Sequence, residues 1–209
     1  MANKKKQGRT RSSNGRGLNW GGPKKKASRW EPLAIVALML AGVGYFIWSW
    51  STDQKLEETL LALAAEGEPL LEERLERHRD NGRRHLGLGE IFQYGDRYPT
   101  SGPHSSIWTR TGVHDSPQPS INLVHALEHG NIVIYIDQPA ADVRKTIEEW
   151  AGLYTGQWDG IVVTADPGLG EGMVLSAWRH RIQLERFEPE IVAAFIDRFR
   201  GRGPEQAVR

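Results

Sequence analysis

The residues of this chain best suited to chemistry are its histidines, of which there are seven in 209 residues. Two of them flank a glutamate in the sequence His125-Ala-Leu-Glu128-His129. Positions i, i+3 and i+4 of a helix share one face, so two imidazoles and a carboxylate would point into the same volume. Zn²⁺ and other borderline transition metals accept both ligand types. The spacing therefore indicates a metal site. The structural alternative is a polar pocket in which the histidines only form hydrogen bonds.

A third ligand is expected from the turn-rich loop Tyr98-Pro-Thr-Ser-Gly-Pro-His104. Its glycine permits unusual backbone angles and its prolines restrict φ, so the loop is stiff and fixes the direction of His104. A fourth candidate, His85, stands in another glycine-rich stretch, Arg84-His-Leu-Gly-Leu-Gly89. We therefore predict His104, His125, His129 and His85 as ligands of a transition metal, Zn or Cu.

Three functions fit these residues. The first is a metal-binding domain without catalysis, active in metal handling or in the maturation of a membrane complex. The second is a zinc-dependent hydrolase in which histidine ligands leave a position for water and Glu128 acts as general base, which would be its one assignable catalytic residue. The third is a structural or scaffold domain of a membrane complex that binds no metal. We favour the first, and the sequence leans away from an enzyme because no substrate-binding motif accompanies the histidines.

Composition excludes several classes of protein. The chain has no cysteine, which rules out disulfide frameworks, thiolate metal sites, iron–sulfur clusters and a cysteine nucleophile. Its 27 basic and 26 acidic residues are unevenly distributed, because ten basic and no acidic residues precede residue 31. The remainder carries a net charge of −9, so nucleic acid is not an expected partner.

A membrane span is predicted over residues 32–52, which contain no charged side chain. The 18 residues Leu33–Trp50 are almost all apolar. As a helix they would extend about 27 Å, close to the roughly 30 Å hydrocarbon core. Aromatic residues flank the run, as they do at membrane interfaces. A cleaved signal peptide is the alternative, but the apolar run is long and no Ala-x-Ala site follows, so we favour an uncleaved signal-anchor.

The positive-inside rule then places residues 1–31, a disordered basic tail, in the cytoplasm, and the rest outside the cell membrane. The expected partners are the lipid bilayer through residues 32–52, anionic lipid headgroups through the basic tail, and a further membrane protein.

The elements that must position the histidines follow this span. Residues 53–80 are expected to form a helical stalk, broken at 67–69 by glycine and proline, before a globular domain over 81–205. Within that domain, helices are predicted at 120–129, 140–152 and 188–199, and strands at 131–136, 160–165, 173–178 and 180–186. The predicted fold is α+β, with one sheet of four to five strands packed by helices.

At these motifs the chain resembles the domain-of-unknown-function family number 3105. The resemblance covers about residues 85–205 and depends on Tyr98–His104, on Trp108 with Gly112-Val113, on Leu123-Val-His-Ala-Leu-Glu-His-Gly130 and on Arg200-Gly-Arg-Gly-Pro204-Glu205. It implies a membrane-anchored or exported protein whose characteristic polar positions are His85, His104, His125, Glu128 and His129. His114 stands where that family is expected to have an aromatic residue, so it is not counted as a ligand.

Overall fold

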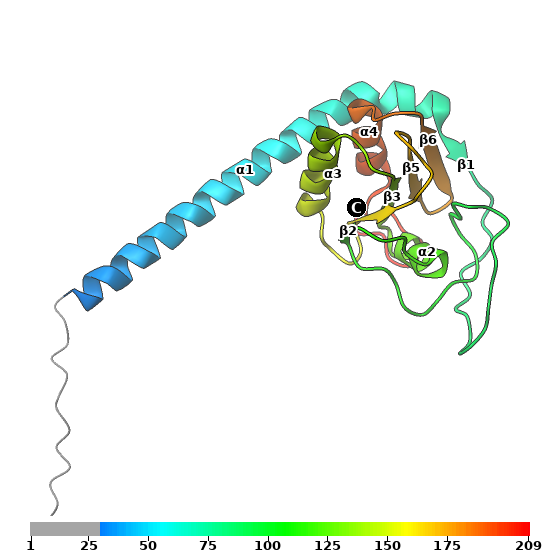
Figure 1. The fold of residues 1–209 in the computed structure, drawn as a ribbon, viewed down its shortest axis with the longest axis horizontal. Helices are drawn as coiled ribbons and strands as arrows, with labels where there is room; N and C mark the ends of the chain where they lie inside the picture. Colours follow the sequence, from blue (N-terminus) through cyan, green and yellow to red (C-terminus); the bar gives the residue numbers. More distant parts are fainter. Residues whose placement is uncertain (1–29) are drawn as a thin grey trace, which may run out of the picture. The chain divides into compact units, whose positions relative to one another are not determined.

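The structure is a computed structural model that describes residues 30–209. The predicted basic tail falls almost entirely on residues 1–29, outside the described residues. The described part begins with a 44-residue helix, α1 (Glu31–Arg74) (Figure 1). The chain divides within this helix into two compact units, Met1–Phe46 and Ile47–Arg209, which are considered separately.

The apolar side chains at the start of α1 are exposed, for example Leu38 and Leu40. Within residues 30–209, α1 is the one helix long and apolar enough to cross a membrane, with a mean hydropathy of 1.9 in its most apolar window. No residue of that window is buried. Exposed apolar surface of this extent is unfavourable in water. The helix suits a single-pass anchor, and a signal sequence near an N-terminus has the same properties.

The later part of α1 belongs to the folded domain. Its buried positions Leu60, Ala64, Gly67 and Leu71 are spaced by three or four residues and form one stripe on the helix. The predicted break at 67–69 is wrong, because the helix continues through Pro69 to Arg74. Gly67 has a packing role: a Cβ atom there would lie 2.0 Å from the Glu190 carbonyl oxygen. This part of α1 therefore belongs to the core of the domain and is more than a stalk.

The domain contains one mixed six-stranded sheet, in the order β1-β6-β5-β3-β4-β2. Its strands are β1 (Glu76–Arg77), β2 (Gly112–His114), β3 (Ile132–Ile136), β4 (Ile161–Ala165), β5 (Met173–Ala177) and β6 (His180–Leu184). The pairs β3–β4 and β4–β2 are parallel, and the other pairs are antiparallel. The α+β class is confirmed, with more strands than the four to five predicted.

Helices cover both faces of this sheet, as alternation along β3 shows. Ile132, Ile134 and Ile136 enter a core that also contains side chains of α1, α3 (Ala141–Leu153) and α4 (Pro189–Phe199). Val133 and Tyr135 enter a second core with α2 (Ser120–His129) and the irregular segment before it. Successive strand residues point to opposite faces, so one strand serves both cores. In Figure 1, α2 lies apart from α3 and α4.

Candidate metal centre

Three polar residues of the candidate site lie on α2, in which every residue from Leu123 to the last, His129, is buried. His125, Glu128 and His129 are only 3–5% exposed. The helix ends as predicted at Gly130, whose positive φ of 98° lets its N–H bond the carbonyls of the last turn. A helix fixed at its end by this cap holds the three side chains at defined positions.

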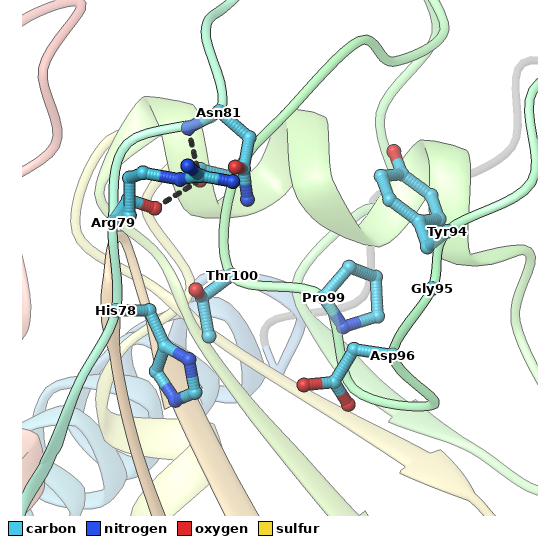
Figure 2. A pocket seen from close by; sticks show the side chains of 9 residues that line it. His78, Arg79, Asn81, Tyr94, Gly95, Asp96, Pro99 and Thr100 are labelled. Carbon is cyan, nitrogen blue, oxygen red and sulfur yellow. Dashed lines mark hydrogen bonds between the residues drawn. The ribbon is translucent and has the colours of Figure 1, made fainter.

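The two loop histidines, His85 and His104, are brought together by backbone pairing between two distant segments. Asn81 N–H donates to Ser101 Oγ at 3.0 Å, beside a cavity of about 240 Å³ (Figure 2). Gly102 N–H then donates to the Gly82 carbonyl, and His104 N–H to that of Arg84. The last contact belongs to a parallel bridge between His85 and His104. Residues 19 positions apart thus become neighbours.

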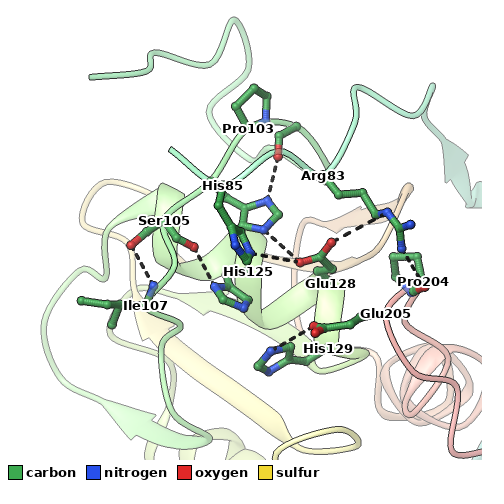
Figure 3. A network of polar contacts seen from close by, with 12 residues as sticks. Arg83, His85, Pro103, Ser105, Ile107, His125, Glu128, His129, Pro204 and Glu205 are labelled. Atoms are coloured by element: carbon green, nitrogen blue, oxygen red, sulfur yellow. Dashed lines mark hydrogen bonds and ion pairs between the residues drawn. The ribbon is translucent and has the colours of Figure 1, made fainter. Parts of the chain in front are cut away.

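His85, His104, His125 and Glu128 form one group. Each offers a ligand atom, and these four atoms all lie within 4.8 Å of one another. The three imidazole ring centroids are each 5.0 Å from the other two, so the rings occupy the corners of an equilateral triangle. Figure 3 shows His85, from one of the loop segments, beside His125 and Glu128 of α2. The group can hold a metal ion.

Two of the imidazoles are oriented by backbone carbonyls. Nδ1 of His104 lies 2.8 Å from the Gly102 carbonyl oxygen, and Nδ1 of His125 lies 2.7 Å from that of Ser105. A carbonyl oxygen only accepts hydrogen bonds, so both Nδ1 atoms carry the proton. This leaves Nε2 of each ring as the atom available to a metal. Carbonyl contacts of this kind fix the tautomer and the ring direction in metal sites.

The contact between His104 and Glu128 shows what the group needs in order to be stable. Nε2 of His104 lies 2.9 Å from Oε2 of Glu128, and the histidine is fully buried. Since Nδ1 already carries a proton, this contact requires either one further proton shared between Nε2 and the carboxylate or a cation bound by both atoms. Two ligand atoms at 2.0–2.2 Å from one ion are roughly 2.9 Å apart at the right angle of a square-planar Cu²⁺ site and roughly 3.3–3.6 Å apart at the tetrahedral angle of Zn²⁺. The geometry therefore fits two ligands of one ion.

Burial and neighbouring imidazoles favour the neutral form of His125. The pKa of His125 is lowered, first by burial and then by His104 and His85, while a hydrogen bond to Ser105 opposes the shift. Arg83 Nε lies 3.9 Å from Oε1 of Glu128, the oxygen turned away from His104. Glu128 is thus held between a guanidinium and the imidazoles.

His129 belongs to a second group, with His125 and Glu205, whose ligand atoms also lie within 4.8 Å of one another. Its ring packs between Trp108 and Trp158, at centroid distances of 4.9 and 4.4 Å. Nε2 lies 3.3 Å from Oε2 of Glu205, and Nδ1 is buried without a hydrogen-bond partner. Burial, reinforced by His125, lowers the pKa of His129 to about 4.

The four histidines predicted as ligands are thus divided by the structure. His85, His104 and His125 share one group, which also contains Glu128, the residue expected to act as a base only in a hydrolase. His129 lies beside His125 but in the second group, with Glu205. Sequence reasoning missed Glu205 as a site residue, although it stands at the end of the motif Arg200-Gly-Arg-Gly-Pro204-Glu205. His78, His114 and His180 lie outside both groups.

Comparison with known proteins identifies the family. The family described as "Protein of unknown function (DUF3105)" matches residues 85–209, more than half of the chain, and the chain belongs to this family. The match begins at His85 and contains every residue of both groups. No curated protein and no solved structure matches.

Proposed function

We propose that this member of the DUF3105 family binds one transition metal ion, Zn²⁺ or Cu²⁺, through His85, His104, His125 and Glu128. In this proposal the domain handles metal at the membrane, in delivery or in the maturation of a membrane complex, without a reaction of its own. The observation that carries it is the buried contact of 2.9 Å between His104 Nε2 and Glu128 Oε2, which an ion shared by the two atoms explains.

The chemistry of the donor set supports these metals. Imidazole nitrogen and carboxylate oxygen suit Zn²⁺ and Cu²⁺, and copper is expected to bind more tightly. A thioether site for Cu⁺ is disfavoured, because Met173, the one methionine of residues 53–209, is buried in the core on the other face of the sheet. The lowered pKa of His125 also supports metal binding at neutral pH, since a metal need not displace a proton from its ring.

Binding is favoured over hydrolysis by the position of Glu128. A catalytic zinc ion usually keeps one position open for water, whereas a holding site is closed by four protein ligands. The cluster offers four donors, and Glu128 contacts a histidine of the set directly. A carboxylate used as a ligand is not free to act as a base for water. His85, with 51% of its side chain exposed, gives this otherwise buried group an edge in contact with solvent.

The membrane arrangement is part of the proposal. Residues 32–52 of α1 form an uncleaved anchor that crosses the bilayer, with the basic residues before it in the cytoplasm and near anionic lipid headgroups. The metal-binding domain then lies outside the membrane, where it meets a membrane-protein partner that supplies or receives the ion. The charge asymmetry around the apolar run supports this orientation.

Metal analysis of the full chain in detergent tests the proposal. After loading with Zn²⁺ or Cu²⁺ and removal of free metal, we expect one ion per chain. His125→Gln should lower the affinity by about ten-fold or more, since a ligand is lost. His114→Gln is the matched control, because His114 lies in neither group. Equal metal content in His125→Gln and the control would contradict the proposal.

A further inference from the structure

The second group of possible ligands, His125, His129 and Glu205, is also positioned by backbone contacts. Glu205 comes from the C-terminal segment, and its N–H donates to the carbonyl oxygen of Glu128 at the end of α2. Gly203 permits this close approach: a Cβ atom there would lie 2.2 Å from that same oxygen. Gly201 N–H also donates to the Gly130 carbonyl. The carboxylate of Glu205 is thereby held at His129 by the backbone around it.

His129 has an incomplete set of partners for so buried a residue. Its side chain is 3% exposed, and its Nδ1 has no hydrogen-bond partner. Buried polar atoms are rarely left unpaired, and those that are often mark a site for an ion or a ligand. Glu205, in contrast, is 44% exposed. The second group therefore extends from the interior to the surface, beside the first group, in which His85 alone is exposed.

The two groups share His125, and this residue can serve only one of them at a time. Its Nδ1 donates to the Ser105 carbonyl, so only Nε2 has a lone pair for a metal. That single lone pair binds one ion. Two ions cannot both be ligated by His125, and the two groups are alternative positions for the same ion. The rings of His125 and His129 are neighbours, with centroids 4.6 Å apart.

The geometry points to a transfer station: His129 and Glu205, with His125, bind the metal ion as it passes between solvent and the buried group of His85, His104, His125 and Glu128. This inference rests on the proposed function and adds a path to it. The exposed carboxylate of Glu205 captures the ion first, and His125 remains a ligand while Glu205 and His129 are exchanged for His104 and Glu128.

Binding of Co²⁺ to the full chain in detergent, followed by its visible absorption, tests the station at equilibrium. Loss of the buried group through His104→Gln should leave one weaker Co²⁺ site, held by the station. Adding Glu205→Gln should remove it, whereas adding Glu171→Gln, an exposed glutamate outside both groups, should not. We use Glu205 for this test because it is half-exposed, so its amide variant is expected to fold.

Release of Co²⁺ to EDTA tests the path. Glu205→Gln in the otherwise natural chain should slow release by about ten-fold or more relative to Glu171→Gln, since the ion loses its intermediate ligand. Equal release rates in Glu205→Gln and Glu171→Gln would contradict the transfer station. So would residual Co²⁺ binding in His104→Gln that is unchanged by adding Glu205→Gln. If the natural chain binds no Co²⁺, both the proposed function and the transfer station are contradicted. If the natural chain binds one ion through His104 while Glu205→Gln behaves as the control, only the station fails.

Discussion

His104 and Glu128 are 24 positions apart in the chain, yet Nε2 of the histidine lies 2.9 Å from Oε2 of the glutamate. One is fixed by a loop that pairs with residues 82–86, and the other by α2. The contact closes the buried group and brings one carboxylate and three imidazoles into one small volume. Substitution of either residue therefore tests metal binding directly.

Glu128→Gln should weaken metal binding while keeping the shape of the side chain. The amide carries no charge and is a poorer ligand, so the affinity for Zn²⁺ should fall by about ten-fold or more. Competition with a chromophoric chelator measures this. Glu171→Gln serves as the control, and an unchanged affinity in Glu128→Gln would show that this carboxylate is not a ligand.

Gly67→Ala should destabilise the domain by about 1–3 kcal/mol, because the new methyl group has no space against the Glu190 carbonyl. The matched control is Gly152→Ala in α3, where a Cβ atom would meet nothing within 4 Å. That change should be neutral or stabilising by up to about 1 kcal/mol, since alanine favours a helix more than glycine does. Urea unfolding of the full chain in detergent compares them. Similar unfolding midpoints would show that α1 does not pack closely on α4.

The metal-free protein should lose stability as the pH falls from about 6.5 toward 4. The pKa of His129 is about 4 in the folded chain against a reference value of 6.5. Between these values the unfolded chain takes up a proton that the folded chain does not, so the contribution is present above 6.5 and is lost on acidification. Thermal unfolding of the natural chain and of His129→Gln at several pH values measures it. The variant should show the shallower pH dependence, and parallel curves would contradict the burial of a neutral His129.

Membrane orientation can be tested because the chain has no cysteine. Single cysteines introduced as Ser12→Cys and Glu171→Cys report each side of the apolar run with a membrane-impermeant maleimide. In intact cells Glu171→Cys should react and Ser12→Cys should react only after the membrane is opened. The reverse pattern would invert the orientation, and loss of the N-terminal residues from the mature chain would identify a cleaved signal peptide.

The regular elements were largely predictable because their sequences are strongly patterned. β3, rich in β-branched residues, and α2, ended by Gly130, both lie within a residue of their expected bounds. β1 and β2 contain two and three residues, too few to show any alternation. The continuity of α1 was missed because Gly67 and Pro69 are local helix breakers, whereas tertiary packing against α4 decides this segment.

The site was predictable only in part. Helical spacing brings His125, Glu128 and His129 to neighbouring positions, but it does not say which of them meets a distant loop. The bridge between His85 and His104 pairs two irregular segments, and no periodicity in the sequence indicates that these segments lie side by side. Glu205 reaches His129 through backbone contacts of a glycine-containing tail, which local sequence does not reveal.

The most direct measurement is an anomalous difference map from crystals of the zinc-loaded protein, recorded at the zinc absorption edge. We expect one strong peak per chain, with Nε2 of His104 and His125, a nitrogen of His85 and an oxygen of Glu128 at about 2.0–2.2 Å from it. A map without a peak among these residues, with His104 still bonded directly to Glu128, would contradict the account.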